Sequence, residues 1–251
     1  MLDLQFDQTH LGEAMVFVLG PTAEDPFPPV ELAERQPDGL LAAGGDLEVA
    51  RLLNAYQSGI FPWFGPGDPI LWWSPDPRMI LLPAELHISR SMRKFMRTRN
   101  LEFKLDSAFE QVIHACAAPR EQQSGTWIGP EMIAAYVRLH QQDWAHSAEL
   151  WQSGELLGGL YGVAIDRFFF GESMFSRRTN ASKAAFIGLV AFLQASGFAC
   201  IDCQLHTDHL ESLGARLVER SVFMDLMCRY CRDRRHKVDW QNYSSRLPGS
   251  Y

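Results

Sequence analysis

The sequence predicts an α+β fold in two parts, on the strength of three observations. Helical and strand-like segments occur in runs rather than in strict alternation, which is typical of α+β proteins. Turn-forming residues crowd the first third of the chain and thin out beyond it. With 251 residues, 47% of them hydrophobic, the chain can bury one large core or two smaller ones. We expect a small domain at residues 1–77 and a larger one at 78–251, with a loosely ordered tail after about residue 238.

The first part contains one clear helical segment between turns. Residues 47–58 have helical periodicity, with Leu52 and Tyr56 on the apolar stripe, and Asp46 stands at the expected N-cap. The segment SPDPR at residues 74–78 is expected to be extended or turning, because each proline disfavours helix in the residue before it. The domain boundary is therefore placed there.

The larger part is expected to begin with helices and to continue with strands. A helix at residues 89–97 buries Met92, Phe95 and Met96 on one face. The four basic residues that share its outer face are Arg90, Arg93, Lys94 and Arg97. The later predicted elements are helices at 108–117 and 130–141, strands at 146–151, 156–165, 167–175 and 198–205, a helix at 182–196, a short helix at 209–213 and a strand at 216–219. The second and third of these strands meet at Asp166, which indicates a hairpin.

The charge distribution leaves the kind of partner open. The net charge of −7 argues against nucleic acid, but residues 90–99 and 228–237 together carry +9. An acidic body with two basic segments can face two differently charged partners, and it is equally what solvated helix faces produce. The N-terminus lacks the apolar run of a secretory signal, the longest apolar run is about half a membrane span, and five cysteines fit a reducing compartment. We expect a cytoplasmic protein without a membrane segment.

Two Cys-x-x-Cys pairs, Cys200/Cys203 and Cys228/Cys231, raise the possibility of a zinc site. The first pair lies in a predicted strand, where residues three apart point to opposite faces, and no glycine follows to permit a knuckle turn. The second pair lies in a helical pattern, where the thiols can simply be buried. We therefore expect no metal and no cofactor.

Polar residues in two apolar strands are the better candidates for chemistry. Alternation along the strand places Asp202 and Gln204 on one face, and Glu172 interrupts the apolar run FFFGESMF at residues 168–175. A carboxylate at such a position pairs with a cation or lines a cleft. If the two strands share a sheet, these three side chains surround one pocket. The alternative is an ordinary edge strand whose polar face meets water.

Eight colinear motifs resemble one family, the leucyl/phenylalanyl-tRNA–protein transferases. They are DGLLAAGGDL (38–47), GIFPWF (59–64), LWWSPDPR (71–78), HISRSM (87–92), GTWI (125–128), GESMFS (171–176), NASK (180–183) and IDCQ (201–204). The resemblance spans roughly residues 26–225. It implies a bacterial cytoplasmic enzyme with a small N-terminal domain packed on a C-terminal domain of the GNAT-like, acyl-CoA N-acyltransferase fold.

The resemblance also implies the reaction and its partners. Leu or Phe, and less readily Met, is moved from aminoacyl-tRNA to the α-amine of a protein that begins with Arg or Lys, which marks that protein for degradation as an N-degron. Direct aminolysis of the tRNA ester requires no covalent intermediate, and a single chain is expected to suffice. Gln204 is expected to bind the attacking amine and Asp202 to orient Gln204 and offset the developing charge. Glu172 is placed near the amino group of the substrate, and Glu172 or Asp202 is suspected to recognise the acceptor's basic side chain.

The resemblance assigns the remaining site residues to two substrate parts. The pocket for the transferred side chain consists of Leu160, Phe169, Met174, Phe186, Leu189 and Ile201. The residues around the 3′-terminal adenosine are Trp63, Trp127 and Tyr136, and aromatic stacking on a base is worth roughly 1–3 kcal/mol. The basic face of the 89–97 helix is expected to contact the tRNA backbone.

Two other functions remain possible from the sequence. An acetyl-CoA-dependent N-acetyltransferase would share the fold, but residues 176–183 lack the glycines that let backbone N–H groups approach a pyrophosphate. A non-catalytic module that binds tRNA or N-degrons would explain the basic segments and the apolar pocket. It would not explain the polar pair beside them.

Overall fold

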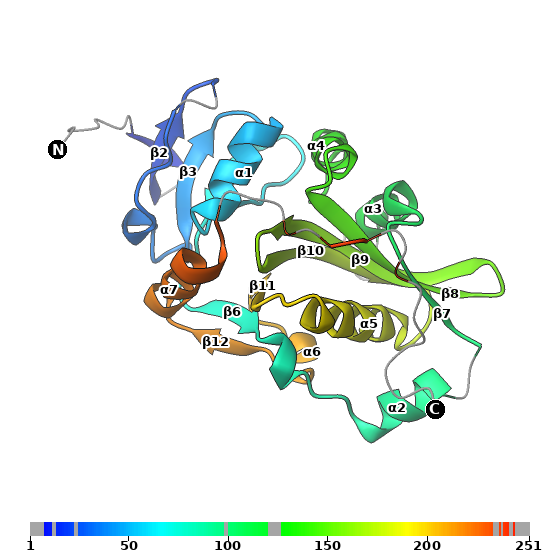
Figure 1. Ribbon diagram of the computed structural model, residues 1–251. Helices are drawn as coiled ribbons and strands as arrows, with labels where there is room; N and C mark the ends of the chain where they lie inside the picture. Colours follow the sequence, from blue (N-terminus) through cyan, green and yellow to red (C-terminus); the bar gives the residue numbers. More distant parts are fainter. Residues whose placement is uncertain are drawn as a thin grey trace.

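The protein is described by a computed structural model that covers residues 8–11, 14–22, 25–97, 100–119, 127–232, 236, 238–240 and 243. Within these residues the chain forms a five-stranded sheet and a seven-stranded sheet (Figure 1). The change from one sheet to the other falls in the short stretch after Trp73 and before Arg78. The expected α+β class is therefore confirmed.

The smaller sheet has the strand order β1-β2-β3-β5-β4. Its elements are β1 (Gln8–Leu11), β2 (Ala14–Leu19), η1 (Val30–Leu32), β3 (Leu40–Gly44), α1 (Val49–Gln57), β4 (Phe61–Pro62) and β5 (Leu71–Trp73). Only α1 was expected from the sequence, because the strands are short and lie among turn residues. The expected N-cap was also wrong. Helix α1 begins after Glu48, whose backbone N–H donates to Asp46 Oδ1 over 2.8 Å.

The larger sheet is mixed and has the strand order β12-β6-β11-β10-β9-β8-β7. Its strands are β6 (Arg78–Leu81), β7 (Glu102–Leu105), β8 (Ala145–Gln152), β9 (Glu155–Ile165), β10 (Phe168–Ser176), β11 (Cys200–Gln204) and β12 (Arg216–Val218). Its helices are η2 (Pro83–Glu85), α2 (Arg90–Arg97), α3 (Phe109–Ala117), α4 (Pro130–Gln141), α5 (Ala181–Ala195), α6 (Asp208–Glu211) and α7 (Arg220–Tyr230). Strands β6 and β7 were not expected. Helix η2 was not expected either, and α7 covers the helical pattern that was predicted around Cys228. The remaining elements lie within two or three residues of their expected bounds.

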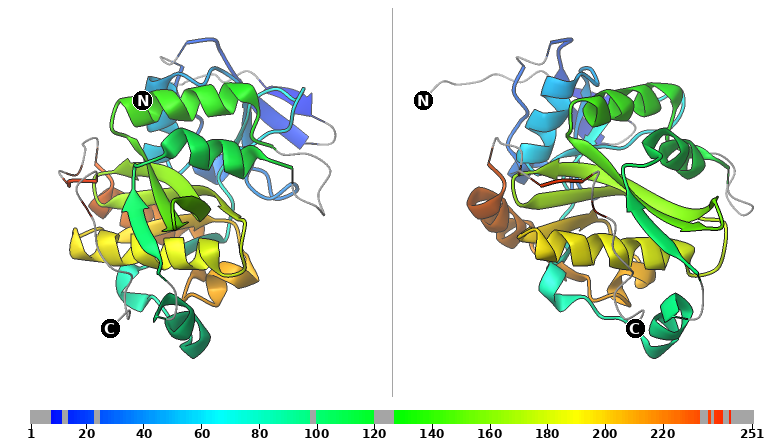
Figure 2. Two further views of the ribbon diagram at one scale, coloured as in Figure 1. Left: turned by 90° about the vertical axis from the view of Figure 1, so that its right-hand side faces the viewer. Right: turned by 45° about the vertical axis from the view of Figure 1, so that its right-hand side comes forward.

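Helices cover both faces of the larger sheet (Figure 2). Helices α3 and α4 pack on one face, and α5 runs along the other. The core on the α3/α4 side is continuous with the core of the smaller domain, since it includes both Leu52 of α1 and Met132 of α4. The α5 side has its own core, which includes Ile187 and Phe192. This layered arrangement agrees with the GNAT-like domain that was expected.

The predicted hairpin and the expected tail can both be compared with the structure. Strands β9 and β10 pair in antiparallel register up to Ile165 opposite Phe168, with Asp166 at φ +47° in the turn, so the hairpin is confirmed. Trp240, in the tail expected to be loose, is buried and stacks on His146 at 3.8 Å between ring centroids. Residues 241–242 and 244–251 of that tail lie outside the described residues. No helix of the described ranges is long and apolar enough to span a membrane.

Candidate active site

The candidate site lies where β10 and β11 separate. The two strands pair in parallel register only as far as Phe170 opposite Asp202. Immediately beyond that point each strand has a bulge against its other neighbour, with Glu172 as the extra residue of β10 and Cys203 as that of β11. Bulges re-aim side chains, and they are frequent next to active sites. The Glu172 and Gln204 side chains span the gap, where Gln204 Nε2 donates to Glu172 Oε1 over 2.7 Å.

Two tyrosines complete a cluster around Glu172. Tyr56 of α1 donates its hydroxyl to Glu172 Oε1 over 2.7 Å, and Tyr136 of α4 donates to Oε2 over 2.8 Å. The two hydroxyls also contact each other. We call Glu172, Tyr56, Tyr136 and Gln204 the Glu172 cluster. It draws its donors from three elements and from both domains. The sequence predicted every member as a site residue except Tyr56. Tyr56 lies on the apolar stripe of a helix, and this pattern does not indicate what its hydroxyl binds.

The environment of Glu172 raises its pKa from 4.5 to about 7. Burial is the largest cause, since it penalises the charged form, and the nearby Asp202 acts in the same direction. The hydrogen bonds from Tyr56, Tyr136 and Gln204 favour the carboxylate and oppose the shift. The pKa of both tyrosines is well above 10, chiefly through burial and also through the charge of Glu172, so their hydroxyls stay protonated donors. A carboxylate that titrates near pH 7 is suited to accept and release a proton.

The structure corrects the expected relation between Asp202 and Gln204. Strict alternation would place them on one face, but the bulge and the φ of +61° at Gln204 turn the two side chains apart. Asp202 is fully buried and binds Arg78, while its Oδ1 accepts the backbone N–H of Gln204 over 2.9 Å. Glu172 therefore binds the Gln204 carboxamide directly, whereas Asp202 binds the Gln204 backbone, and the orienting role of Asp202 stays a prediction. Both carboxylates suspected of recognising the acceptor's basic side chain are already engaged by partners within the chain.

The six residues expected to hold the transferred side chain gather on the α5 side of the larger sheet. They are Leu160, Phe169, Met174, Phe186, Leu189 and Ile201, and all belong to or pack against the core on that side. Five of them are at most 3% exposed, and Met174 is partly exposed. Met174 follows Glu172 by two residues on β10, so it lies at the edge of this core that is nearest the Glu172 cluster.

The three residues expected around the adenosine differ in their surroundings. Trp63 is 39% exposed beside Trp73, with 5.5 Å between ring centroids, and it can offer a face for stacking. Trp127 is partly buried. Tyr136 is fully buried, with its ring edge-on to Tyr161 and its hydroxyl on Glu172, and its assignment to the adenosine stays a prediction.

The basic residues of α2 form an exposed face, as expected. Met92 and Met96 are buried, and Phe95 is partly buried on the opposite side. The exposed basic residues are Arg90, Arg93, Lys94 and Arg97. Residues 98–99 of this basic segment, residues 233–235 and 237 of the second basic segment and residues 125–126 of the GTWI motif lie outside the described residues.

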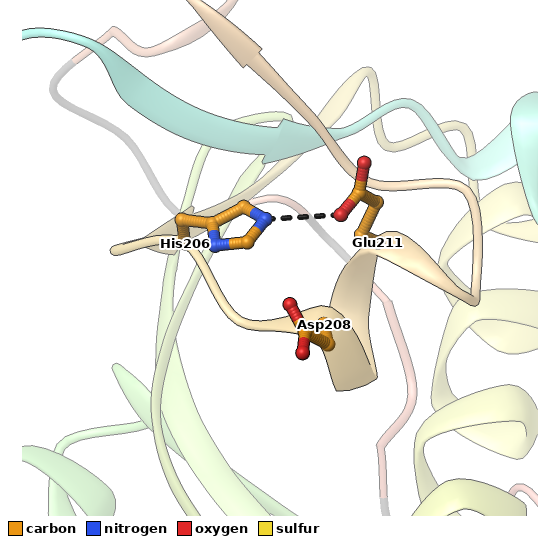
Figure 3. Close-up of side chains that lie close together, drawn as sticks. All are labelled: His206, Asp208 and Glu211. Carbon is orange, nitrogen blue, oxygen red and sulfur yellow. Dashed lines mark hydrogen bonds and ion pairs between the residues drawn. The ribbon is translucent and has the colours of Figure 1, made fainter.

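The cysteines do not form a metal site among the described residues, in which no group of three potential ligands includes a thiol. Burial raises the pKa of the Cys200, Cys203 and Cys231 thiols, which keeps them protonated. One group without cysteine does occur within the described ranges: His206, Asp208 and Glu211 lie close together around the start of α6 (Figure 3). All three are exposed, and His206 Nε2 already lies 3.0 Å from Glu211 Oε2.

These features define the class of protein: an α+β enzyme whose site couples a carboxylate of pKa near 7 to an oriented carboxamide. Residues 80–228 match the leucyl/phenylalanyl-tRNA protein transferase family, and residues 45–76 match the N-terminal domain of the same family. The chain therefore belongs to the leucyl/phenylalanyl-tRNA protein transferase family. It is an aminoacyltransferase that uses leucyl- or phenylalanyl-tRNA and a protein acceptor.

Curated relatives of the same family cover most of the chain. The chain is 60% identical over 210 residues to a leucyl/phenylalanyl-tRNA–protein transferase of Chromobacterium violaceum, covering 84% of this chain and 89% of the relative. It is 56% identical over 214 residues to the Pseudomonas fluorescens enzyme, covering 85% and 94%. Among solved structures, L-PGS from Bacillus licheniformis is similar with a TM-score of 0.41 and 14% identity, covering 81% of this chain and 66% of that chain.

Proposed function

We propose that the protein transfers Leu or Phe, and less readily Met, from aminoacyl-tRNA to the α-amine of proteins that begin with Arg or Lys. In this proposal the reaction takes place in the bacterial cytoplasm, is catalysed by a single copy of the chain and creates an N-degron. The supporting observation is the hydrogen bond from Gln204 to Glu172, which lies beside the apolar cluster on the α5 side of the sheet.

In this proposal Gln204 binds the attacking amine. A carboxylate only accepts hydrogen bonds, so the Gln204 group that faces Glu172 is its NH2. The carboxamide oxygen then remains free to accept a hydrogen bond from the α-amine and to align its lone pair with the ester carbon. Alignment of two reactants in this way can supply roughly 7–11 kcal/mol of the barrier.

Glu172 is the proposed proton acceptor. The α-amine has a reference pKa of about 7.7–8.0, close to the pKa of about 7 for Glu172. In the transfer step a C–N bond forms and the bond between the ester carbon and the ribose oxygen breaks. The nitrogen loses one proton, Glu172 takes it up, and the leaving ribose oxygen receives it, so the enzyme returns to its starting state.

The other residues are assigned to the remaining parts of the substrates. The apolar residues Leu160, Phe169, Met174, Phe186, Leu189 and Ile201 hold the transferred side chain. Trp63 and Trp127 bind the terminal adenosine, and the exposed face of α2 binds the tRNA backbone. Because backbone contacts are independent of sequence, this face suits an enzyme that accepts several tRNA species.

A single-turnover assay tests the proposal. Labelled Leu, Phe and Met are supplied on tRNA in parallel, with peptides that begin with Arg, Lys or Ala as acceptors. Transfer to the Arg and Lys peptides is expected for Leu and Phe and more weakly for Met, whereas the Ala peptide should remain unmodified. Equal transfer to all three peptides would contradict the proposed acceptor.

The tRNA interface is tested by the salt dependence of tRNA binding. The logarithm of the affinity should fall by roughly 0.7–0.9 per phosphate contact for each tenfold rise in salt. Neutralising Arg93 and Lys94 together to Gln should flatten this slope by about two contacts. An unchanged slope would exclude α2 from the interface.

A further inference from the structure

A buried ion pair beneath the Glu172 cluster has no part in the chemistry derived so far. Arg78 Nε lies 2.9 Å from Asp202 Oδ1, and Arg78 Nη2 lies 2.7 Å from Oδ2. The side chains are 1% and 0% exposed. The two residues stand at the start of β6 and on β11, in strands that pair directly with each other.

The surroundings of Arg78 fix the position of its guanidinium group. The rings of Phe61, from β4 of the smaller domain, and Phe223, from α7, each lie 4.7 Å from the guanidinium carbon. Nη1 has no hydrogen-bond partner among the described residues. The carboxylate of Asp202 is therefore the charged group to which this cation is held, through both of its oxygens.

Asp202 connects this pair to the site. Its Oδ1, which accepts from Arg78 Nε, also accepts the backbone N–H of Gln204 over 2.9 Å. Gln204 has the left-handed φ of +61° that residues with a side chain rarely adopt, and Cys203 bulges out before it. A backbone in such a conformation needs support from its surroundings. The bond to Asp202 supplies that support at the residue whose side chain reaches Glu172.

We infer that Arg78 is a positioning residue for the transfer reaction, because it holds Asp202 in the place that fixes the bulge of β11 and so directs the Gln204 carboxamide to Glu172. The expected effect on kcat rests on the proposed function. The expected effect on the orientation of the Gln204 carboxamide rests on the geometry alone. Asp202, in this account, acts through the backbone of Gln204 while its charge is engaged by Arg78. Arg78 itself touches neither the ester nor the amine.

The test is a double-mutant cycle between Arg78→Lys and Gln204→Ala in the full-length protein. Lysine keeps the charge but cannot bind both carboxylate oxygens in the planar fork geometry of arginine. We expect Arg78→Lys to lower kcat at least tenfold and to change KM for aminoacyl-tRNA less than threefold. Gln204→Ala should cost at least tenfold in the wild-type background and less than threefold in Arg78→Lys. Equal losses from Gln204→Ala in both backgrounds would overturn the inference.

A matched control separates positioning from lost stability. Arg51 is also fully buried and paired with a carboxylate, Asp46, but its other hydrogen bonds go to the backbone carbonyls of Gly20, Thr22 and Asp25 in the smaller domain. Arg51→Lys should lower Tm, leave kcat of the folded protein within threefold of wild type and leave the effect of Gln204→Ala unchanged. If Arg51→Lys and Arg78→Lys weaken the effect of Gln204→Ala equally, Arg78 has only a general structural role.

A spectroscopic measurement tests the geometry without activity. The side-chain amide signals of Gln204 in protein labelled with ¹⁵N-glutamine can be assigned by their loss in Gln204→Ala. Arg78→Lys should move them toward the position of a free glutamine, and Asp202→Asn serves if Arg78→Lys does not fold. Unmoved signals in a folded variant would overturn the inference. A wild-type protein that transfers no Leu or Phe would instead refute the proposed function, and the amide signals would still decide the role of Arg78.

Discussion

Two glutamates of the same sheet, the fully buried Glu149 and the partly buried Glu172, accept several hydrogen bonds each, and their donors come from different elements. Glu149 on β8 accepts from the hydroxyl groups of Ser107 and Ser147, from the backbone N–H of Ala108 and from Trp151 Nε1. Two of these donors stand two residues away on the same strand, and the others lie in the turn before α3. The donors of Glu172 belong to α1, α4 and β11.

The origin of the donors, rather than their number, distinguishes Glu149 from Glu172, the proposed proton acceptor. Glu149 is held by donors on its own strand and in the turn before α3. These hydrogen bonds also connect the start of α3 to the sheet. The Glu172 cluster forms only when both domains are in place, at a point where the sheet has opened. Its carboxylate has a pKa of about 7 and accepts a hydrogen bond from the Gln204 carboxamide.

The largest difference should appear in turnover. Glu172→Gln removes the proposed proton acceptor, and general acid–base catalysis contributes about 10²–10⁴-fold, so kcat in single-turnover transfer should fall at least about 100-fold. Glu149→Gln, compared at equal folded fraction, should stay within threefold of wild type. Similar losses of kcat in the two variants would contradict the proposed role of Glu172 as the proton acceptor.

Thermal stability should show the reverse order. Glu149→Gln replaces an acceptor that faces four donors with a group that must also donate, and hydrogen bonds to charged groups contribute about 1.5–3 kcal/mol. A loss of about 2 kcal/mol corresponds to a Tm lower by roughly 4–8 °C for a chain of this size. Glu172→Gln should lower Tm less, because it also relieves the burial of a charge. Calorimetry on both variants checks the order.

The two tyrosines should tune Glu172 from opposite domains. Each hydroxyl lowers the pKa of Glu172, so Tyr56→Phe and Tyr136→Phe should each raise that pKa further. The background is set by burial first, then by the hydrogen bond from Gln204 and the charge of Asp202. Because the carboxylate form accepts the proton, activity rises as pH increases through about 7, and this rise should move to higher pH in both variants. The reduction in kcat at pH 7 should be several-fold. Profiles of kcat at saturating peptide measure the shift, and Glu172→Gln, which lacks the group, is the control.

The smallest signal should be the pH dependence of folding stability. The folded pKa of Glu172 lies above its ordinary value of 4.5, so the folded state binds the proton more tightly than the unfolded state. The stability contributed by this group is fully present below pH 4.5 and is lost as pH rises through about 7. Wild type should therefore lose stability relative to Glu172→Gln between pH 5 and pH 8 in denaturant titrations. A constant difference would show that Glu172 is not perturbed in the folded state.

The sequence predicted the parts of the fold that have long periodic patterns. Helices α1 and α5 and the hairpin of β9 and β10 follow from apolar periodicity and from the reversal at Asp166. The strands of the smaller sheet were missed because each has six residues or fewer and lies among turn formers. Strand β6 was not predicted because it directly follows the segment SPDP, whose prolines indicated only a domain boundary.

The sequence predicted most of the polar residues of the candidate site, but it did not predict how their side chains are arranged. Glu172 stood out because it interrupts an apolar strand, and Gln204 because it follows a second one. The strict alternation of a strand then placed Asp202 beside Gln204, and the bulge at Cys203 defeats that alternation. Tyr56 and Arg78 bind partners 116 and 124 residues away along the chain, and no local pattern marks such pairs.

The hydrogen bond from Tyr56 to Glu172 crosses the domain boundary, so the Glu172 cluster depends on both domains being present. A fragment that retains only the larger sheet keeps Glu172, Gln204 and Tyr136 but lacks the hydroxyl that α1 provides, and the apolar surface shared with α1 would then face water. Cleavage of the chain between Trp73 and Arg78, followed by separation of the two domains, should therefore abolish activity although every proposed reacting group stays intact.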